Sequence, residues 1–159
     1  MENVIIDRNF NMQILVDADA CPVKQETIEI AKQFNIDVCL VASYNHYLPT
    51  IAGVKTVQVD FESQAADMYI ANLVKRSDIV LTHDFGLACL VLAKQAYALS
   101  FRGEPYSSDS IDYLLERRAE SAKIRRQGGK TKGPKPFTSD DRKKFQQSLT
   151  KLLIQLAGE

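Results

Sequence analysis

The sequence has few of the features that build disulfide scaffolds, zinc modules or membrane spans. Three cysteines, Cys21, Cys39 and Cys89, occur among 159 residues without any C-x-x-C pair, which argues against a disulfide framework and a zinc knuckle. No apolar run approaches the roughly 18 residues of a membrane helix. Residues 1–11 contain two acids and no long apolar core, so they do not resemble a secretory signal. We therefore expect a cytoplasmic protein with reduced thiols and no membrane partner.

What is present is the composition of an ordinary soluble domain. The chain is 45% hydrophobic and 25% charged, and its length suffices for one domain with its own core. We expect residues 1–11 to form an N-terminal extension and residues 12–159 to form a single domain. That domain includes a basic loop, residues 127–137, and a C-terminal helix.

Apolar runs of strand length alternate with segments of helical periodicity. The expected strands are Ile14–Val16 with an extension through Asp19, Val38–Ala42, Val54–Val59, Asp78–Thr82 and Tyr97–Phe101. The expected helices are Val23–Phe34, Ser63–Arg76, Gly86–Gln95, residues 107–126, and a last helix capped by Thr138 or Ser139. This alternation predicts a three-layer α/β/α sandwich around a mainly parallel sheet of about five strands. The third strand alternates and is expected near an edge.

Four aspartates are expected at the carboxyl edge of this sheet, where open α/β folds bind ligands. Asp17 and Asp19 follow the first strand two residues apart, and Asp84 follows the fourth strand. Asp67 lies in the first turns of a helix and leans towards its apolar side. Each of these acids has a plainer interpretation, because Asp is also common as a helix cap, in turns and near the positive end of a helix dipole.

Convergence of these acids predicts a metal site. Two carboxylates about 6 Å apart repel by roughly 3 kcal/mol at an effective dielectric constant near 20, so several ionised together require a cation or a proton. An all-oxygen cluster suits Mg²⁺ or Mn²⁺, which assist phosphate-ester hydrolysis. We expect Asp17, Asp67 and Asp84 to be catalytic and all four aspartates to bind metal. A catalytic Cys21 is disfavoured, because neighbouring carboxylates oppose a lowered thiol pKa.

The net charge is zero, but it is unevenly distributed. Residues 117–144 contain eleven Lys/Arg and three acids, a net charge of +8, and the remainder carries −8. Such asymmetry favours a basic arm beside an acidic site, although an ordinary solvated helix and loop would give the same pattern. The expected nucleic-acid-binding residues are Lys24, Ser43, Arg102, Arg125, Arg126, Lys130, Lys132 and Lys135. Tyr44, Tyr47 and Tyr106 are candidates for stacking on bases.

Five ordered motifs support a resemblance that covers residues 12 to 156. They are VDADACPVK (Val16–Lys24), QAADMYI (Gln64–Ile70), DIVLTHDFGLA (Asp78–Ala88), RGEPYSSDSI (Arg102–Ile111) and TKGPKPFTSDDRKKF (Thr131–Phe145). On these motifs the chain resembles the YaiI/YqxD family of bacterial proteins, whose fold belongs with the PIN-like nucleases.

That resemblance implies a nuclease that uses one or two divalent metals, with RNA a more favoured substrate than DNA. Asp17, Asp67 and Asp84 match the acidic positions of PIN-like nucleases, whereas Met68 stands where a further acid often occurs. Two alternatives stay open. The strand followed by D-x-D also begins haloacid-dehalogenase phosphatases, in which the first Asp is a nucleophile. A non-catalytic RNA-binding or adaptor protein would keep the fold without efficient metal binding.

Overall fold

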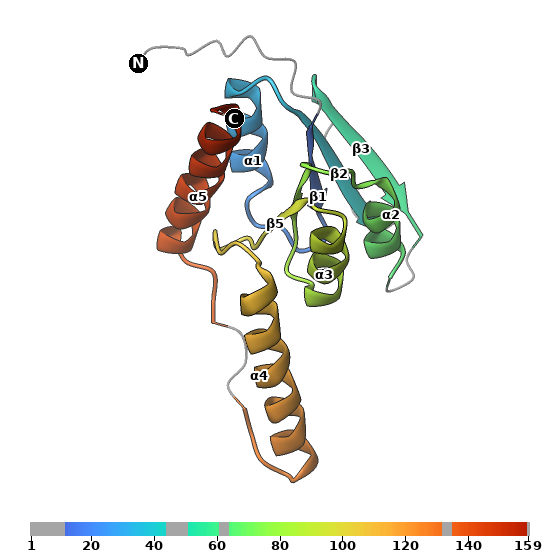
Figure 1. Cartoon of the computed structure of the whole chain (residues 1–159), viewed down its shortest axis with the longest axis vertical. Coiled ribbons are helices and arrows are strands. Elements are labelled where there is room, and N and C mark those ends of the chain that lie inside the picture. Colours follow the sequence, from blue (N-terminus) through green and yellow to red (C-terminus); the bar gives the residue numbers. More distant parts are fainter. Residues whose placement is uncertain (1–11, 44–50, 61–63, 132–134, 159) are drawn as a thin grey trace.

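A parallel five-stranded sheet forms the centre of the computed structural model, which describes residues 12–43, 51–60, 64–131 and 135–158 (Figure 1). The strands are β1 (Gln13–Asp17), β2 (Asp37–Ser43), β3 (Val54–Val59), β4 (Ile79–Leu81) and β5 (Tyr97–Leu99). Their order across the sheet is β3-β2-β1-β4-β5, and every neighbouring pair is parallel. The third strand therefore lies at an edge, as its alternating sequence predicts.

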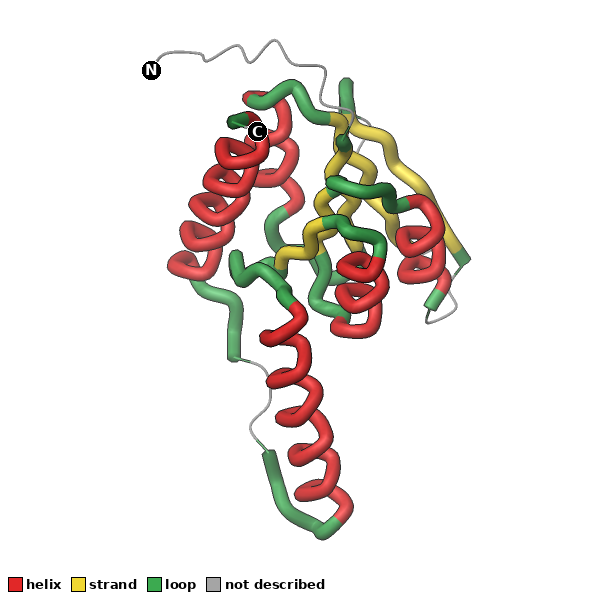
Figure 2. Tube along the Cα trace, viewed as in Figure 1, coloured by secondary structure: helices red, strands yellow, loops and turns green. Residues whose placement is uncertain are grey.

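Helices cover both faces of the sheet (Figure 2). The helices are α1 (Lys24–Gln33), α2 (Ala65–Leu73), α3 (Phe85–Ala93), α4 (Ser108–Arg126) and α5 (Ser139–Ala157). α1 and α5 pack on one face, and α2 and α3 pack on the other. The predicted three-layer α/β/α sandwich is confirmed. No helix among the described residues is long and apolar enough to cross a membrane.

The central strand β1 explains the division into two cores. Side chains alternate between the faces of a strand, so Ile14 and Val16 point to the α1/α5 side and Leu15 points to the α2/α3 side. All three are fully buried. Phe145 of α5 and Ile70 of α2 are also fully buried on the two sides. Burial of each such side chain contributes about 1.5–3 kcal/mol, so β1 holds the two layers together.

The strand order creates a crevice between β1 and β4. These strands are neighbours, with Val16 opposite Leu81, but β1 leads to α1 on one face and β4 leads to α3 on the other. Chains that leave adjacent strands in opposite directions open a binding crevice at the carboxyl edge. Asp17 and Asp84 lie at this point.

The expected ends of several elements are wrong. β1 stops at Asp17, and Asp19 lies in a turn rather than on the strand. β5 stops at Leu99 because the chain turns immediately: the Gly103 N–H donates to the carbonyl of Ser100 at 3.0 Å. α2 ends at Leu73, since Val74 adopts extended backbone angles. The expected cap at Ser63 and the extension 1–11 lie outside the described residues.

α4 projects from the sandwich as an arm (Figure 1). It has 19 residues and is therefore about 28 Å long. Ser107 and Ser110 form a capping box at its start, which satisfies two backbone donors. Only Ile111 of this helix is buried, so the rest of the arm is held mainly by helix-internal hydrogen bonds.

Candidate active site

Asp17 and Asp84 are joined through the buried hydroxyl of Thr82. The Thr82 Oγ1 donates to Asp17 Oδ2 at 3.1 Å and accepts the Asp84 backbone N–H at 3.0 Å. Thr82 is fully buried at the end of β4, so its hydroxyl is held in place by the surrounding sheet. One side chain therefore sets the positions of both acidic segments across the β1/β4 crevice.

The Asp17 carboxyl lies in an environment that disfavours its charge. Burial raises its pKa most, the hydrogen bond from Thr82 lowers it, and the charges of Asp19 and Asp84 raise it again. The net pKa is above its ordinary value. Desolvation and like charges both disfavour the ionised form, so a positive charge at this place would stabilise the carboxylate.

Asp67, in the first turn of α2, also lies close to Asp84 and Asp17. Burial, then the charges of Asp84 and Asp17, then a hydrogen bond with the Asp84 side chain raise the Asp67 pKa to about 6. The predicted convergence of acids from three separate segments is therefore present in the structure. Their catalytic and metal-binding roles stay predictions.

The donor set fits a hard cation in its chemistry, but it does not form a closed ligand shell. Carboxylate oxygens are the ligands that Mg²⁺ prefers. However, no three His, Cys, Asp or Glu side chains in the described segments converge closely enough to hold a metal ion. Asp19 Oδ1 accepts the Ser43 N–H and Asp84 Oδ1 accepts the Leu87 N–H, both at 2.8 Å.

The plainer interpretation of Asp84 is also correct. Asp84 is the N-cap of α3, and this contact satisfies one of the free backbone donors at the helix start. A carboxylate has two oxygens and about four acceptor sites, so capping leaves capacity for a further contact. The cap fixes the position of the carboxylate beside Asp17 and Asp67.

Comparison with known proteins assigns the chain to a family. A family model described as "Uncharacterized BCR, YaiI/YqxD family" matches residues 15–155. The chain belongs to the YaiI/YqxD family. The match spans all five strands from Leu15 of β1 onwards and includes the four aspartates.

The family relatives of this YaiI/YqxD protein match it along nearly its whole length. A UPF0178 protein of Halalkalibacterium halodurans is 44% identical over 146 residues, which are 92% of this chain and 93% of the relative. UPF0178 proteins of Listeria monocytogenes and Bacillus cereus are 45% and 46% identical, covering 89% and 91% of this chain and 95% and 100% of the relatives. Among solved structures, a mutant of Rae1 (YacP) from Bacillus subtilis is similar at a TM-score of 0.45 and 17% identity, covering 91% of this chain and 99% of that one.

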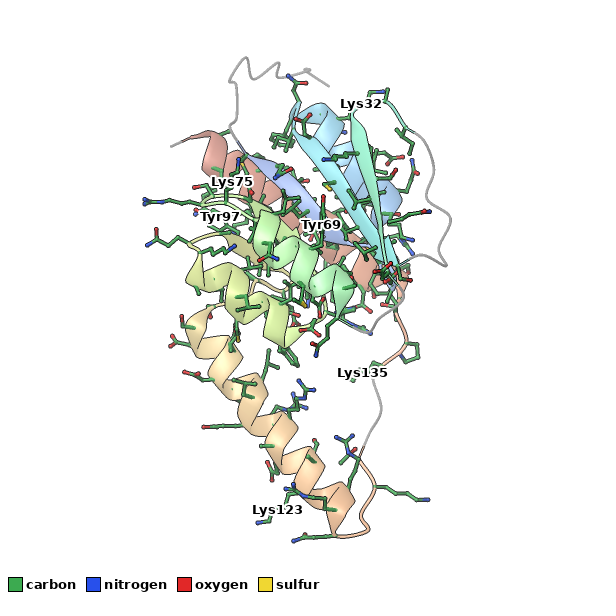
Figure 3. The ribbon with its side chains drawn as sticks, turned by 90° about the vertical axis from the view of Figure 1, so that its right-hand side faces the viewer. Lys32, Tyr69, Lys75, Tyr97, Lys123 and Lys135 are labelled. Atoms are coloured by element: carbon green, nitrogen blue, oxygen red, sulfur yellow. The ribbon has the colours of Figure 1, made fainter. Side chains whose placement is uncertain are left out.

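The predicted nucleic-acid-binding residues of this YaiI/YqxD protein lie in separate parts of the structure. Lys24 and Ser43 lie at the first position of α1 and the last position of β2, close to the acids in sequence and fold. Arg125, Arg126 and Lys130 are exposed at the distal end of the arm. Figure 3 shows Lys123 on the part of α4 farthest from the sheet. Lys132 lies outside the described residues, as do Tyr44 and Tyr47.

Arg102 has structural partners in addition to its predicted role. Its guanidinium forms an ion pair with Asp141 at 2.6 Å, donates to the carbonyl of Lys135, and lies 5.7 Å from the centre of the Phe137 ring. These contacts tie the turn after β5 to the start of α5. Lys135 itself is exposed on the return segment from the arm (Figure 3).

The structure shows the surroundings of two further residues near the acids, Cys21 and His83. Burial raises the pKa of the Cys21 thiol to about 12, so the thiolate needed by a nucleophile is not available at neutral pH. His83 packs edge-on against Phe101 with ring centres 4.3 Å apart. Burial and then the charge of Arg102 lower the His83 pKa, which keeps the imidazole neutral at pH 7.

Thr82 is the site residue that the sequence analysis missed. Its hydroxyl contacts both acidic segments, yet in the sequence it is only the last residue of an apolar strand. A signal was present, because a polar residue that ends a buried strand directly before an acidic turn needs a hydrogen-bonding partner. The nearest candidates for that partner were the aspartates of the neighbouring strand.

Proposed function

We propose that this YaiI/YqxD protein is a divalent-metal-dependent phosphodiesterase that acts on nucleic acid, with RNA favoured over DNA. The observation that carries the proposal is the proximity of Asp17, Asp67 and Asp84, which come from three separate segments at the carboxyl edge of the sheet: the charge of Asp84 raises the pKa of Asp17, and the charges of Asp84 and Asp17 raise the pKa of Asp67. Clustered, strongly perturbed carboxyls in an α/β crevice are typical of functional sites.

The cluster is electrostatically incomplete without a positive charge. Burial, the neighbouring charges of Asp84 and Asp17, and a hydrogen bond with the Asp84 side chain raise the Asp67 pKa to about 6, so below that pH a proton on Asp67 relieves part of the repulsion. At neutral pH a Mg²⁺ or Mn²⁺ ion held by Asp17, Asp67 and Asp84, with Asp19 beside them, would supply the compensating charge. When bound, such an ion polarises a phosphoryl oxygen and lowers the pKa of its bound water.

The surrounding charge suits a polyanionic substrate. The residues 117–144 carry a net charge of +8, and the described basic residues at the end of the arm are exposed. Lys and Arg side chains bind phosphates without reading sequence. The arm would hold a strand that extends to the acidic crevice.

The decisive experiment measures cleavage of single-stranded RNA while Mg²⁺ or Mn²⁺ is titrated. We expect Asp17→Asn to reduce cleavage by about 100-fold or more, without loss of the fold by circular dichroism. The matched control is Asp37→Asn, because Asp37 is exposed at the amino end of β2, opposite the crevice. Equal cleavage by wild type and Asp17→Asn would refute the proposal.

A second candidate is an RNA-binding protein that does not cleave. It is favoured by one observation: the described acids do not form a closed group of three metal ligands. Salt-sensitive RNA binding without Mn²⁺ binding or turnover would establish this function. Trapping of a phosphate analogue on Asp17 would instead establish the phosphatase chemistry that the D-x-D motif left open.

A further inference from the structure

A cavity of about 420 Å³ lies directly beside the acidic cluster. His83 and Phe85, the two neighbours of Asp84 in the chain, form part of its wall, and Tyr106 forms another part. Small-molecule sites usually have volumes of about 300–1,000 Å³ and are lined by aromatic groups with a few polar ones. We infer that this cavity is a nucleobase subsite, which receives an unpaired base of the nucleic acid; this rests on the proposed function for the nature of the substrate.

The turn after β5 builds one wall of the cavity. The Ser100 N–H donates to the Glu104 carbonyl and the Tyr106 N–H donates to the Ala98 carbonyl, both at 2.9 Å. The Ser100 Oγ accepts the backbone N–H of Glu104 at 3.0 Å. These bonds fold residues 100–106 back along β5 and bring the Tyr106 ring to the carboxyl edge of the sheet.

Phe85 provides a second aromatic surface at a fixed angle. The Phe85 and Tyr106 rings meet edge to face, with centres 5.9 Å apart and planes at 83°. Phe85 is the first residue of α3, whose cap is Asp84. Both rings are half-buried, so each keeps accessible surface. Aromatic surfaces of this kind bind bases of any sequence by stacking.

Polar side chains in the cavity can form hydrogen bonds with the donor and acceptor groups at the edges of a base. Arg102, Glu104 and Ser110 also line it. Arg supplies donors and Glu supplies acceptors, whereas the Ser110 hydroxyl is already hydrogen-bonded to the Ser107 backbone. Arg102 is held in place by Asp141 and the Phe137 ring, so part of the polar wall is fixed before a ligand arrives. An apolar ligand without polar edges would leave these groups unpaired.

The cavity is joined to the acids through Thr82. The Tyr106 hydroxyl donates to the Thr82 carbonyl at 3.2 Å, and the Thr82 hydroxyl contacts Asp17 and the Asp84 backbone. A nucleotide with its phosphate at the aspartates therefore has its base beside this cavity. A base that is paired and stacked in a duplex cannot enter such a site without leaving the stack, so the substrate is single-stranded at this nucleotide.

The test measures binding of the four nucleoside 5′-monophosphates in EDTA, by titration of the ¹⁵N-labelled full-length protein. Ribose 5-phosphate is the probe for phosphate binding alone. We expect saturable shifts at residues 83–85 and 100–106, and binding of ribose 5-phosphate weaker by about tenfold or more, since stacking provides the difference.

Matched variants separate stacking from folding. Phe85→Leu and Tyr106→Leu should each weaken nucleotide binding by about tenfold. Tyr106→Phe keeps the ring and should bind as wild type does. Tyr113→Leu removes an exposed aromatic ring of α4 outside the cavity and should also leave binding unchanged. If Phe85→Leu does not fold, the pair Tyr106→Leu and Tyr106→Phe decides the outcome.

Several results would overturn the inference. The inference fails if nucleotides do not bind saturably, or if ribose 5-phosphate binds as tightly as the nucleotides do. It also fails if the NMR shifts are confined to residues outside 83–85 and 100–106, or if both Leu variants bind nucleotides with wild-type affinity. Failure of the subsite inference can be distinguished from failure of the proposed nuclease function. Asp17→Asn should lose cleavage but keep nucleotide binding in EDTA. Binding without any cleavage by the wild type refutes only the nuclease, and cleavage without nucleotide binding refutes only the subsite.

Discussion

Replacement of Thr82 by valine tests the link between the two acidic segments. Valine keeps the branched shape of threonine but removes its hydroxyl. The substitution deletes the hydrogen bond to Asp17 Oδ2 at 3.1 Å and the acceptor of the Asp84 N–H at 3.0 Å. A bond to a charged group contributes about 1.5–3 kcal/mol and a neutral one about 1 kcal/mol. Because water reaches the half-buried Asp17, we expect the free energy of unfolding to fall by about 2 kcal/mol.

Urea unfolding followed by circular dichroism measures this loss. For a slope of about 2 kcal/mol per molar urea, the midpoint should fall by about 1 M. The matched control is Thr56→Val, because Thr56 is exposed on the edge strand β3. Its stability should change by less than about 0.5 kcal/mol. Equal midpoints for Thr82→Val and Thr56→Val would refute the reasoning.

The pH dependence gives a second, independent readout. The hydrogen bond from Thr82 lowers the Asp17 pKa, so it stabilises the ionised carboxylate. The difference between wild type and Thr82→Val should therefore be largest above the Asp17 pKa and should shrink as the pH falls through it. A difference that is the same at pH 7 and in acid would show that the bond to Asp17 carries little of the effect.

Two further predictions concern Asp67 and the arm. The folded Asp67 pKa of about 6 exceeds its ordinary value of 3.8, so this residue lowers stability as the pH rises from about 4 through about 6. After allowance for its solvent exposure, Asp67→Asn should be more stable than wild type by about 1 kcal/mol at pH 7 and by nothing at pH 4; equal urea midpoints at pH 7 would contradict this. Neutralising Arg125, Arg126 and Lys130 together should lower the salt slope of single-stranded RNA binding by about 2, as measured by fluorescence anisotropy, and an unchanged slope would exclude phosphate contacts at the end of the arm.

Much of the architecture follows from local sequence. Ile14, Leu15 and Val16 are apolar on both sides of the strand, which is possible only where helices cover both faces, and they lie in the central strand. The edge position of β3 follows from its polar alternation. The position of acids directly after strands is also predictable, because the carboxyl ends of parallel strands lie at one edge of the sheet. For that reason the convergence of Asp17 and Asp84 was predictable.

The remaining features depend on tertiary contacts that no local pattern records. β1 ends before Asp19 because the chain turns there, and Asp19 Oδ1 accepts the N–H of Ser43 in β2 at 2.8 Å. The cavity beside Asp84 depends on the return of residues 100–106 along β5. Arg102 was predicted to bind nucleic acid, whereas its ion pair with Asp141 joins residues 39 positions apart. Such long-range pairs become visible only in three dimensions.

The position of α5 in the sandwich has a consequence for biosynthesis. α5 is the last of the described helices to be translated, yet Phe145, Leu149 and Leu153 are at most 1% exposed and complete the layer beside α1. Until these residues leave the ribosome, the nascent chain presents one incompletely covered apolar face of its sheet. Exposed surface of this kind attracts chaperones and promotes aggregation. Native closure of this face therefore waits until α5 has left the ribosome.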